Sequence, residues 1–260
     1  MSTLVVATSA ADAQAVEAIK DHHAQLAGAL AVQVEALIDA TVRTDLAGAS
    51  LASQSLVSWC QSELIPHALA EERTIYPKAH EDLQARLLVD AMIAEHRDIV
   101  ALVEAISAAK TPVRAAANAQ ALLSIFNSHL VKENEQILPL LAQSNEVSLA
   151  ELLGGMHELL GDPAEDMISE GGCGGDCTCG EKDIVGVFPE LDSRVVPHAI
   201  RHATIFGALG SIEVGNGLVL IASHDPLPLL AQVEQRTPGH FNIEYLESGP
   251  ETWRLRFVRV

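Results

Sequence analysis

The strongest constraint on this chain is a phrase that occurs twice. The first copy, residues 67–77, reads HALAEERTIYP, and the second, residues 129–139, reads HLVKENEQILP. In both copies a Glu follows the His after four residues, an Ile after eight and a Pro after ten. Four residues along an α-helix advance about 6 Å and return to nearly the same face, so each His and Glu can bind one centre together. An imidazole beside a carboxylate suits a divalent transition metal.

A single His-x-x-x-Glu pair on a helix is common and usually has a structural explanation. Here the shared Ile75/Ile137 and Pro77/Pro139 extend the match well beyond the two pairs. Such internal repetition is stronger evidence than either copy alone. The repeat therefore predicts two pairs, on two helices, that bind two metals and bridge them.

Helical periodicity extends over four long stretches, about 11–40, 51–76, 84–109 and 112–143, and a short fifth helix is expected at 149–160. Aromatic residues make up only 3% of the chain, so the 48% of hydrophobic residues indicate a core of Ala, Leu and Val, as in helical packing. Pro66 should kink or restart the second helix, and Pro77 should end it. These stretches predict an up-down four-helix bundle.

The first and third helices each place one His on the apolar stripe, His23 and His96. A lone His on such a stripe is often a satisfied core residue. These two, however, would face the same interior as the repeated pairs, and bundle cores often hold metal sites. The predicted ligands are His23, His67, Glu71, His96, His129 and Glu133, with both Glu residues bridging.

The order of these residues, with the HHxxL and EHxxI surroundings of His23 and His96, resembles the hemerythrin-like family in its bacterial HHE cation-binding form over roughly residues 15–160. The resemblance implies a non-haem di-iron centre that binds dioxygen, nitric oxide or peroxide, or senses iron. Oxygen-carrying hemerythrins have a further His where this chain has Val100, and His-x-x-x-x-Asp where it has His129-x-x-x-Glu133. These departures shift the expectation from oxygen carriage toward sensing, scavenging or peroxide chemistry.

Three other features of the bundle bear on the site. His22 is a reserve ligand, although it points about 100° away from His23 on a regular helix. Tyr76 is either a residue near the centre or a packing aromatic at the helix end. A ferritin-like site needs Glu-x-x-His pairs and more carboxylates than imidazoles, so we reject it; a structural zinc ion prefers four ligands.

Residues 163–189 read as a Gly- and Cys-rich linker that contains Cys173, Cys177 and Cys179. The C-x3-C-x-C spacing fits neither the common zinc patterns nor the ferredoxin ones. Three thiolates can still bind a further metal if a fourth ligand comes from elsewhere, or form a redox-sensitive set. The alternative is a flexible tether with incidental cysteines.

From residue 190 the pattern changes to short strands and helices, which predicts a small two-layer αβ sandwich over 190–260 after a bundle at 1–162. The segment resembles DUF2249, which looks related to the TusA/SirA-like sulfur carriers, through Leu191-Asp-x-Arg194, His224-Asp-Pro226 and Trp253-x-x-Arg256. The Cys-Pro pair of the sulfur carriers is absent. His224 at a strand end, joined by His202, is a candidate ligand site; the alternative is a capping role for Asp225 and His224.

The formal charge of −19 argues against nucleic acid and anionic membrane as partners. The N-terminus does not resemble a signal peptide, and no stretch approaches the length of a membrane span, so a cytoplasmic protein is expected. We predict a di-iron protein that binds dioxygen, nitric oxide or peroxide for sensing or stress protection. The C-terminal domain would bind a protein partner. The alternatives are an enzyme that breaks down peroxide or reduces nitric oxide, and an iron-homeostasis module.

Overall fold

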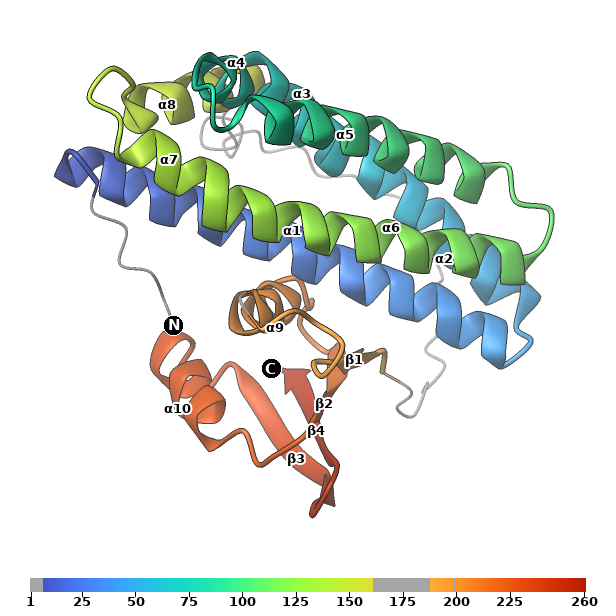
Figure 1. The fold of residues 1–260 in the computed structure, drawn as a ribbon. Helices are drawn as coiled ribbons and strands as arrows, with labels where there is room; N and C mark the ends of the chain where they lie inside the picture. Colours follow the sequence, from blue (N-terminus) through green and yellow to red (C-terminus); the bar gives the residue numbers. More distant parts are fainter. Residues whose placement is uncertain (1–6, 161–187, 199) are drawn as a thin grey trace, which may run out of the picture.

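The computed structural model describes residues 7–160, 188–198 and 200–260, with the side chains of 157–160 left out. Long helical rods lie side by side in the N-terminal bundle (Figure 1). Their segments are α1 (Ala10–Val42), α2 (Leu46–Trp59) with α3 (Ile65–Arg73), α5 (Arg86–Ser107), and α6 (Pro112–Lys132) with α7 (Leu138–Ala142). The short α4 (Ile75–Glu81) and α8 (Leu149–Leu160) close one end. The predicted four-helix bundle is confirmed.

Two of the rods contain a π-helical turn, Cys60–Leu64 and Glu133–Ile137, and each turn lies just before a proline. Proline lacks an N–H donor and its ring crowds the carbonyl four residues earlier, so a wider turn lets the rod continue past Pro66 and Pro139. The prediction that Pro66 should kink or restart the helix agrees with this π-helical turn, after which α3 begins at Ile65. The prediction that Pro77 ends it is wrong: Pro77 lies in the first turn of α4, where backbone N–H groups have no helical partner.

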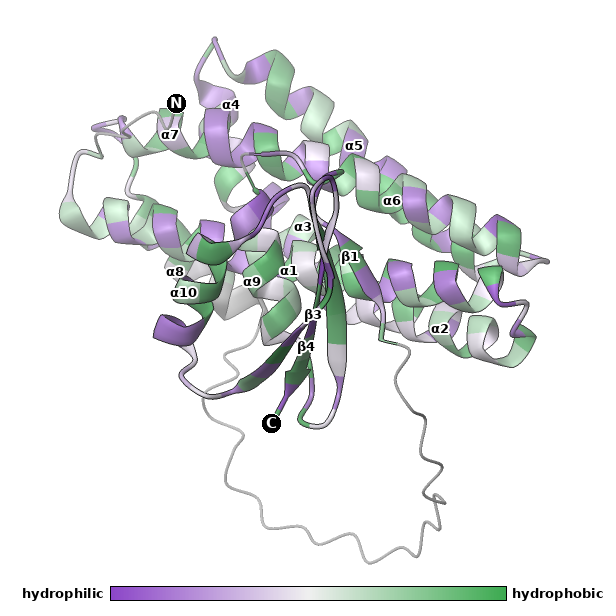
Figure 2. Cartoon of the chain, turned by 90° about the horizontal axis from the view of Figure 1, so that it is seen from below, coloured by the Kyte–Doolittle hydropathy of each residue, from purple (hydrophilic) through white to green (hydrophobic). Residues whose placement is uncertain are grey.

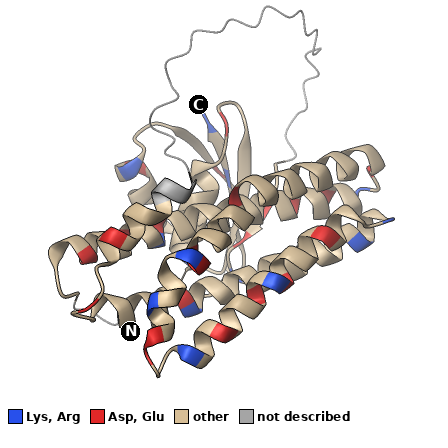
Figure 3. Ribbon diagram, turned by 90° about the horizontal axis from the view of Figure 1, so that it is seen from above, with Lys and Arg blue, Asp and Glu red and all other residues tan. Residues whose placement is uncertain are grey.

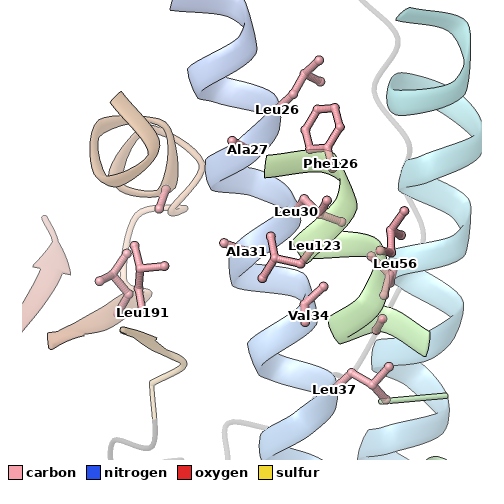
Figure 4. Close-up of a cluster of buried hydrophobic side chains, with 14 of the residues drawn as sticks. Leu26, Ala27, Leu30, Ala31, Val34, Leu37, Leu56, Leu123, Phe126 and Leu191 are labelled. Atoms are coloured by element: carbon pink, nitrogen blue, oxygen red, sulfur yellow. The ribbon is translucent and has the colours of Figure 1, made fainter. Parts of the chain in front are cut away.

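Apolar side chains of α1 form the spine of the bundle core. Leu30, Val34 and Leu37 are fully buried and pack against Leu56 and Phe126 of neighbouring rods (Figure 4). Polar and apolar residues alternate along the helices in Figure 2, as expected for rods with one buried and one exposed face. In Figure 3 acidic residues are distributed along the helices rather than gathered over one of them.

By length and composition alone, α1 passes the test for a membrane span, contrary to the expectation from the sequence. However, 44% of its most apolar window is buried inside the structure. A core helix of a bundle passes the same test, so α1 is weak evidence for a membrane span.

The C-terminal domain contains a four-stranded sheet in the order β1-β2-β4-β3. Its strands are β1 (Glu190–Asp192), β2 (Gly217–Ala222), β3 (Phe241–Ser248) and β4 (Trp253–Arg259); β1 is parallel to β2 and the other pairs are antiparallel. One face, with Leu218 and Phe257, packs against helices α9 (Arg201–Gly210) and α10 (Leu227–Arg236). The opposite face carries ion pairs from Arg254 to Glu190 and from Arg256 to Glu244. The predicted αβ domain is confirmed.

Helix α9 lies between the sheet and α1 (Figure 1). Two glycines allow the backbones of α1 and α9 to approach closely: a Cβ on Gly28 would lie 2.1 Å from the Ala208 nitrogen, and one on Gly207 would lie 2.0 Å from the Ala24 oxygen. No side chain fits at either position. The bundle and the C-terminal domain therefore share one continuous apolar core.

Candidate metal centre

Buried His and Glu side chains from four rods meet in the bundle core. Among the described residues, two groups of three have donor atoms within 4.8 Å of one another: His23, His67 and Glu71, and Glu71, His96 and His129. Each of these five residues, and Glu133, is at most 4% exposed. The structure thus brings together all six residues that the sequence pattern predicted.

Glu71 belongs to both groups because its two oxygens face different imidazoles. Its Oε1 lies 2.8 Å from His67 Nε2 and 3.2 Å from His23 Nε2, and its Oε2 lies 3.5 Å from His96 Nε2. Carboxylates bridge paired metals in other helical bundles. Glu71 therefore links the two groups.

Glu133 also lies beside both groups. Its Oε2 is 3.8 Å from His23 Nε2 and 3.7 Å from His129 Nε2, so it faces one imidazole of each group. Neither of its oxygens has a hydrogen-bond partner, although the residue is fully buried. A buried carboxylate without a partner is costly unless a cation satisfies it.

Three polar side chains orient the imidazoles from outside. Asn134 Oδ1 lies 2.7 Å from His23 Nδ1, Glu72 Oε1 lies 2.9 Å from His96 Nδ1, and Glu95 Oε2 lies 3.1 Å from His129 Nδ1. A hydrogen bond at Nδ1 leaves Nε2 available as a metal ligand, which is the usual outer support of metal-binding histidines. The Nε2 atoms of His23, His96 and His129 are thus left free to face the centre of the site.

These supporting residues were not predicted from the sequence, yet they share a signal. Glu72 follows Glu71, Glu95 precedes His96, and Asn134 follows Glu133. Each is the chain neighbour of one candidate ligand but supports a ligand on another rod. Adjacency alone does not say which imidazole is supported, because that depends on how the rods pack.

The pKa values of the two central carboxyls move in opposite directions. Burial raises the pKa of Glu71, but the imidazoles of His67, His23 and His96 lower it well below its ordinary value. Burial and the nearby Glu71 raise the pKa of Glu133 well above its ordinary value. Both carboxyls lie within 4 Å of the same atom, His23 Nε2. Two buried carboxyls so close together cannot both be ionised without a large free-energy cost unless positive charge is added.

The donor set fits divalent transition metals. Imidazole nitrogens lie about 2.1 Å from such an ion, so two nitrogens about 3 Å apart can share one; His96 Nε2 and His129 Nε2 are 3.2 Å apart. His67 Nδ1 is buried without a hydrogen-bond partner, and so are both oxygens of Glu133. A cation would satisfy these atoms.

Comparison with protein families agrees with this arrangement. Residues 14–141 match the hemerythrin HHE cation-binding domain, and residues 190–259 match the uncharacterized conserved protein family DUF2249. The chain carries a hemerythrin HHE domain followed by a DUF2249 domain. No curated protein and no solved structure matches it. Together, the family and the His/Glu groups indicate that the bundle binds a cation.

Tyr76 lies inside the hemerythrin HHE domain, with its hydroxyl 3.0 Å from His129 Nε2 and its ring stacked on His96 at 5.4 Å. It is 1% exposed. Burial, then Glu133 and Glu71, raise its pKa, which keeps the phenol protonated. Of the two readings of Tyr76, the structure favours a residue beside the centre.

His22 is half-buried next to the HHE site, and its ring centre lies 4.9 Å from that of His67. It belongs to neither donor group. Because a helix turns about 100° per residue, it points away from His23 as expected. Its role as a reserve ligand stays a prediction.

The remaining candidates lie elsewhere in the chain. Cys173, Cys177 and Cys179, with most of the predicted linker, lie outside the described residues.

In the DUF2249 domain, His202 and His224 are exposed and belong to neither donor group found in the described part of the chain. Asp225 accepts a hydrogen bond from the Tyr245 hydroxyl at 2.9 Å, and α10 begins at Leu227 without a side-chain cap. The alternative, a capping role for Asp225, is therefore wrong: its carboxylate accepts from Tyr245 on β3 instead.

Proposed function

We propose that the hemerythrin HHE domain holds two iron ions with His23, His67, Glu71, His96, His129 and Glu133, and that this centre binds dioxygen, nitric oxide or peroxide for sensing or stress protection. The observation that carries the proposal is the shared Glu71, whose two oxygens face two different groups of buried imidazoles. Iron would supply an open coordination position for the small ligand. The chain would supply the bridging carboxylates, the oriented imidazoles and a site closed to bulk water.

The count of protein ligands supports an open position. Four imidazoles and two bridging carboxylates provide eight bonds to two metals, which leaves room on octahedral ions for a small ligand. Val100 stands where oxygen-carrying hemerythrins have a further imidazole, so one ion would be the more open of the two. That asymmetry favours reaction or sensing over reversible carriage of oxygen.

Metal content tests the ligand assignment. We expect His67→Ala and Glu133→Ala to lose most of the iron that the wild-type chain binds, because each change removes a donor from the shared site. His80→Ala is the matched control, since His80 is partly exposed and contacts Asp90 on the bundle surface. Near-wild-type iron in both of the first two variants, measured by elemental analysis of folded protein, would refute the assignment.

A second function, peroxide breakdown or nitric oxide reduction, is favoured by Tyr76. Its protonated hydroxyl lies 3.0 Å from His129 Nε2 and can donate a proton at the centre. The two functions are separated by exposing the anaerobically reduced protein to oxygen, nitric oxide and peroxide in turn. A reversible change of the visible spectrum supports sensing, whereas sustained consumption of peroxide or nitric oxide supports an enzyme.

The iron-homeostasis reading makes a different prediction in the same experiment. If iron occupancy is itself the signal, the gases and peroxide change nothing beyond releasing iron.

The predicted role of the DUF2249 domain as a docking module for a protein partner also stays a proposal. A pull-down with the isolated domain is unsuitable as a test, because its core is continuous with the bundle.

A further inference from the structure

A pocket of about 710 Å³ lies between the bundle and the C-terminal domain. Its size falls within the range of about 300–1,000 Å³ that is typical of small-molecule sites, which also favour domain boundaries. One wall comes from α1 and the π-turn after α2, and the other from α9, α10 and the ends of β3 and β4. The pocket therefore exists only while α9 is packed on α1.

The apolar part of the lining includes three aromatic rings. Trp59 belongs to the bundle wall, and Phe206 and Phe241 belong to the opposite wall. Each of the three is partly exposed, so its ring can contact a ligand. Flat aromatic surfaces on two walls suit a molecule with an aromatic or otherwise apolar body.

Two guanidinium groups add positive charge on the C-terminal wall. The Arg236 guanidinium lies 4.4 Å from the centre of the Phe206 ring, and Arg259 Nη1 donates to the carbonyls of Gly210 and Ile212 at 3.3 and 2.7 Å. Both groups are thus held in position before a ligand arrives, which lowers the entropic cost of binding. The acids of the lining, Asp21 and Glu63, are exposed on the opposite wall.

The pocket also adjoins the candidate metal centre. His22 lines it, and the His22 ring lies 4.9 Å from the ring of His67. On the same stretch of α1, His23 faces the metal centre and Gly28 contacts α9. A molecule in the pocket would therefore touch the helix that carries a proposed metal ligand and the helix that carries the second domain.

We infer that this interdomain pocket binds a small organic anion with an apolar, aromatic body. Its negative group pairs with Arg236 and Arg259, and its rings lie between Trp59 and Phe206. The proposal does not depend on the metal bound in the bundle, and its test has a readout that needs no metal.

Trp59 provides that readout. The chain has only one other tryptophan, Trp253 on β4, which packs against Tyr245 and does not line the pocket. In full-length Trp253→Phe protein, Trp59 is thus the sole tryptophan. Two fluorescent probes share one ring system: 1-anilinonaphthalene-8-sulfonate is anionic, and N-phenyl-1-naphthylamine is neutral. Titration with each probe is followed by quenching of Trp59 emission.

We expect saturable binding of one sulfonate probe per chain, about tenfold tighter than that of the neutral probe, because charge-assisted bonds to guanidinium are strong. Arg236→Gln should remove that preference, and Ala203→Phe, which adds no tryptophan, should abolish binding by filling the pocket. Arg256→Gln, on the opposite face of the sheet, is the control with the same change of charge. Equal affinity for the two probes, or binding unchanged by Arg236→Gln, would overturn the inference. Arg236→Gln alone decides it if Ala203→Phe does not fold.

Discussion

At the scale of single residues, the centre depends on side chains that hold the imidazoles as much as on the imidazoles themselves. Glu95 contacts His129 Nδ1 and also Lys132. The hydrogen bond from His129 lowers the pKa of its carboxyl, and the nearby Lys132 lowers it further against the opposing effect of burial, so the carboxylate stays an acceptor. Without the Glu95 carboxylate, the ring of His129 would be free to rotate.

We expect Glu95→Ala to weaken iron binding by about 10–100-fold, the usual effect of removing such an outer partner. Glu104→Ala, exposed on the same helix, is the control and should bind iron as the wild type does. Competition with a calibrated chelator measures the affinity. Equal affinity in the two variants would show that His129 is oriented by other contacts.

At the scale of helices, a close backbone contact joins α1 to α9 through Gly28 and Gly207. Glycine in a helix costs about 0.5–1 kcal/mol relative to alanine, so its presence here needs a reason. The reason is steric, because a Cβ on Gly28 would overlap the backbone of Ala208.

Gly28→Ala should therefore separate α9 from α1 despite the better helix propensity of alanine. The radius of gyration from small-angle X-ray scattering should rise, and the melting temperature should fall. Gly154→Ala on α8 is the matched control: nothing lies within 4 Å of its added Cβ, so it should stabilise by up to about 1 kcal/mol. An unchanged scattering profile for Gly28→Ala would contradict the close contact.

At the scale of the whole molecule, the packing of the two domains places like charges together. Burial, then Asp192 of β1 and Asp39, raise the pKa of Glu35 on α1 from 4.5 to about 7. The folded state then holds a proton that the unfolded state releases. The contribution of Glu35 to stability is highest below pH 4.5 and decreases as the pH rises toward 7.

Glu35→Gln should accordingly raise the free energy of unfolding above pH 7 by about 1–3 kcal/mol, with little difference near pH 4. Glu17→Gln, exposed on the same helix, should leave the pH profile unchanged. Urea unfolding between pH 4 and 8 measures both. A constant difference between Glu35→Gln and wild type across that range would show that Glu35 does not titrate against Asp192.

The amino-acid sequence by itself determined the rods, the αβ domain and the six central residues, because helical periodicity and the repeated His-x-x-x-Glu spacing act within one segment. Only the tertiary structure decided which partner each group takes. Glu71 faces both groups, Glu95 supports His129, and Asp225 bonds to Tyr245 rather than capping a helix. The interdomain pocket follows from the contact of Gly28 with α9, which joins segments almost 180 residues apart. Local spacing fixes the face of a helix on which a side chain lies, but only packing fixes what that face meets.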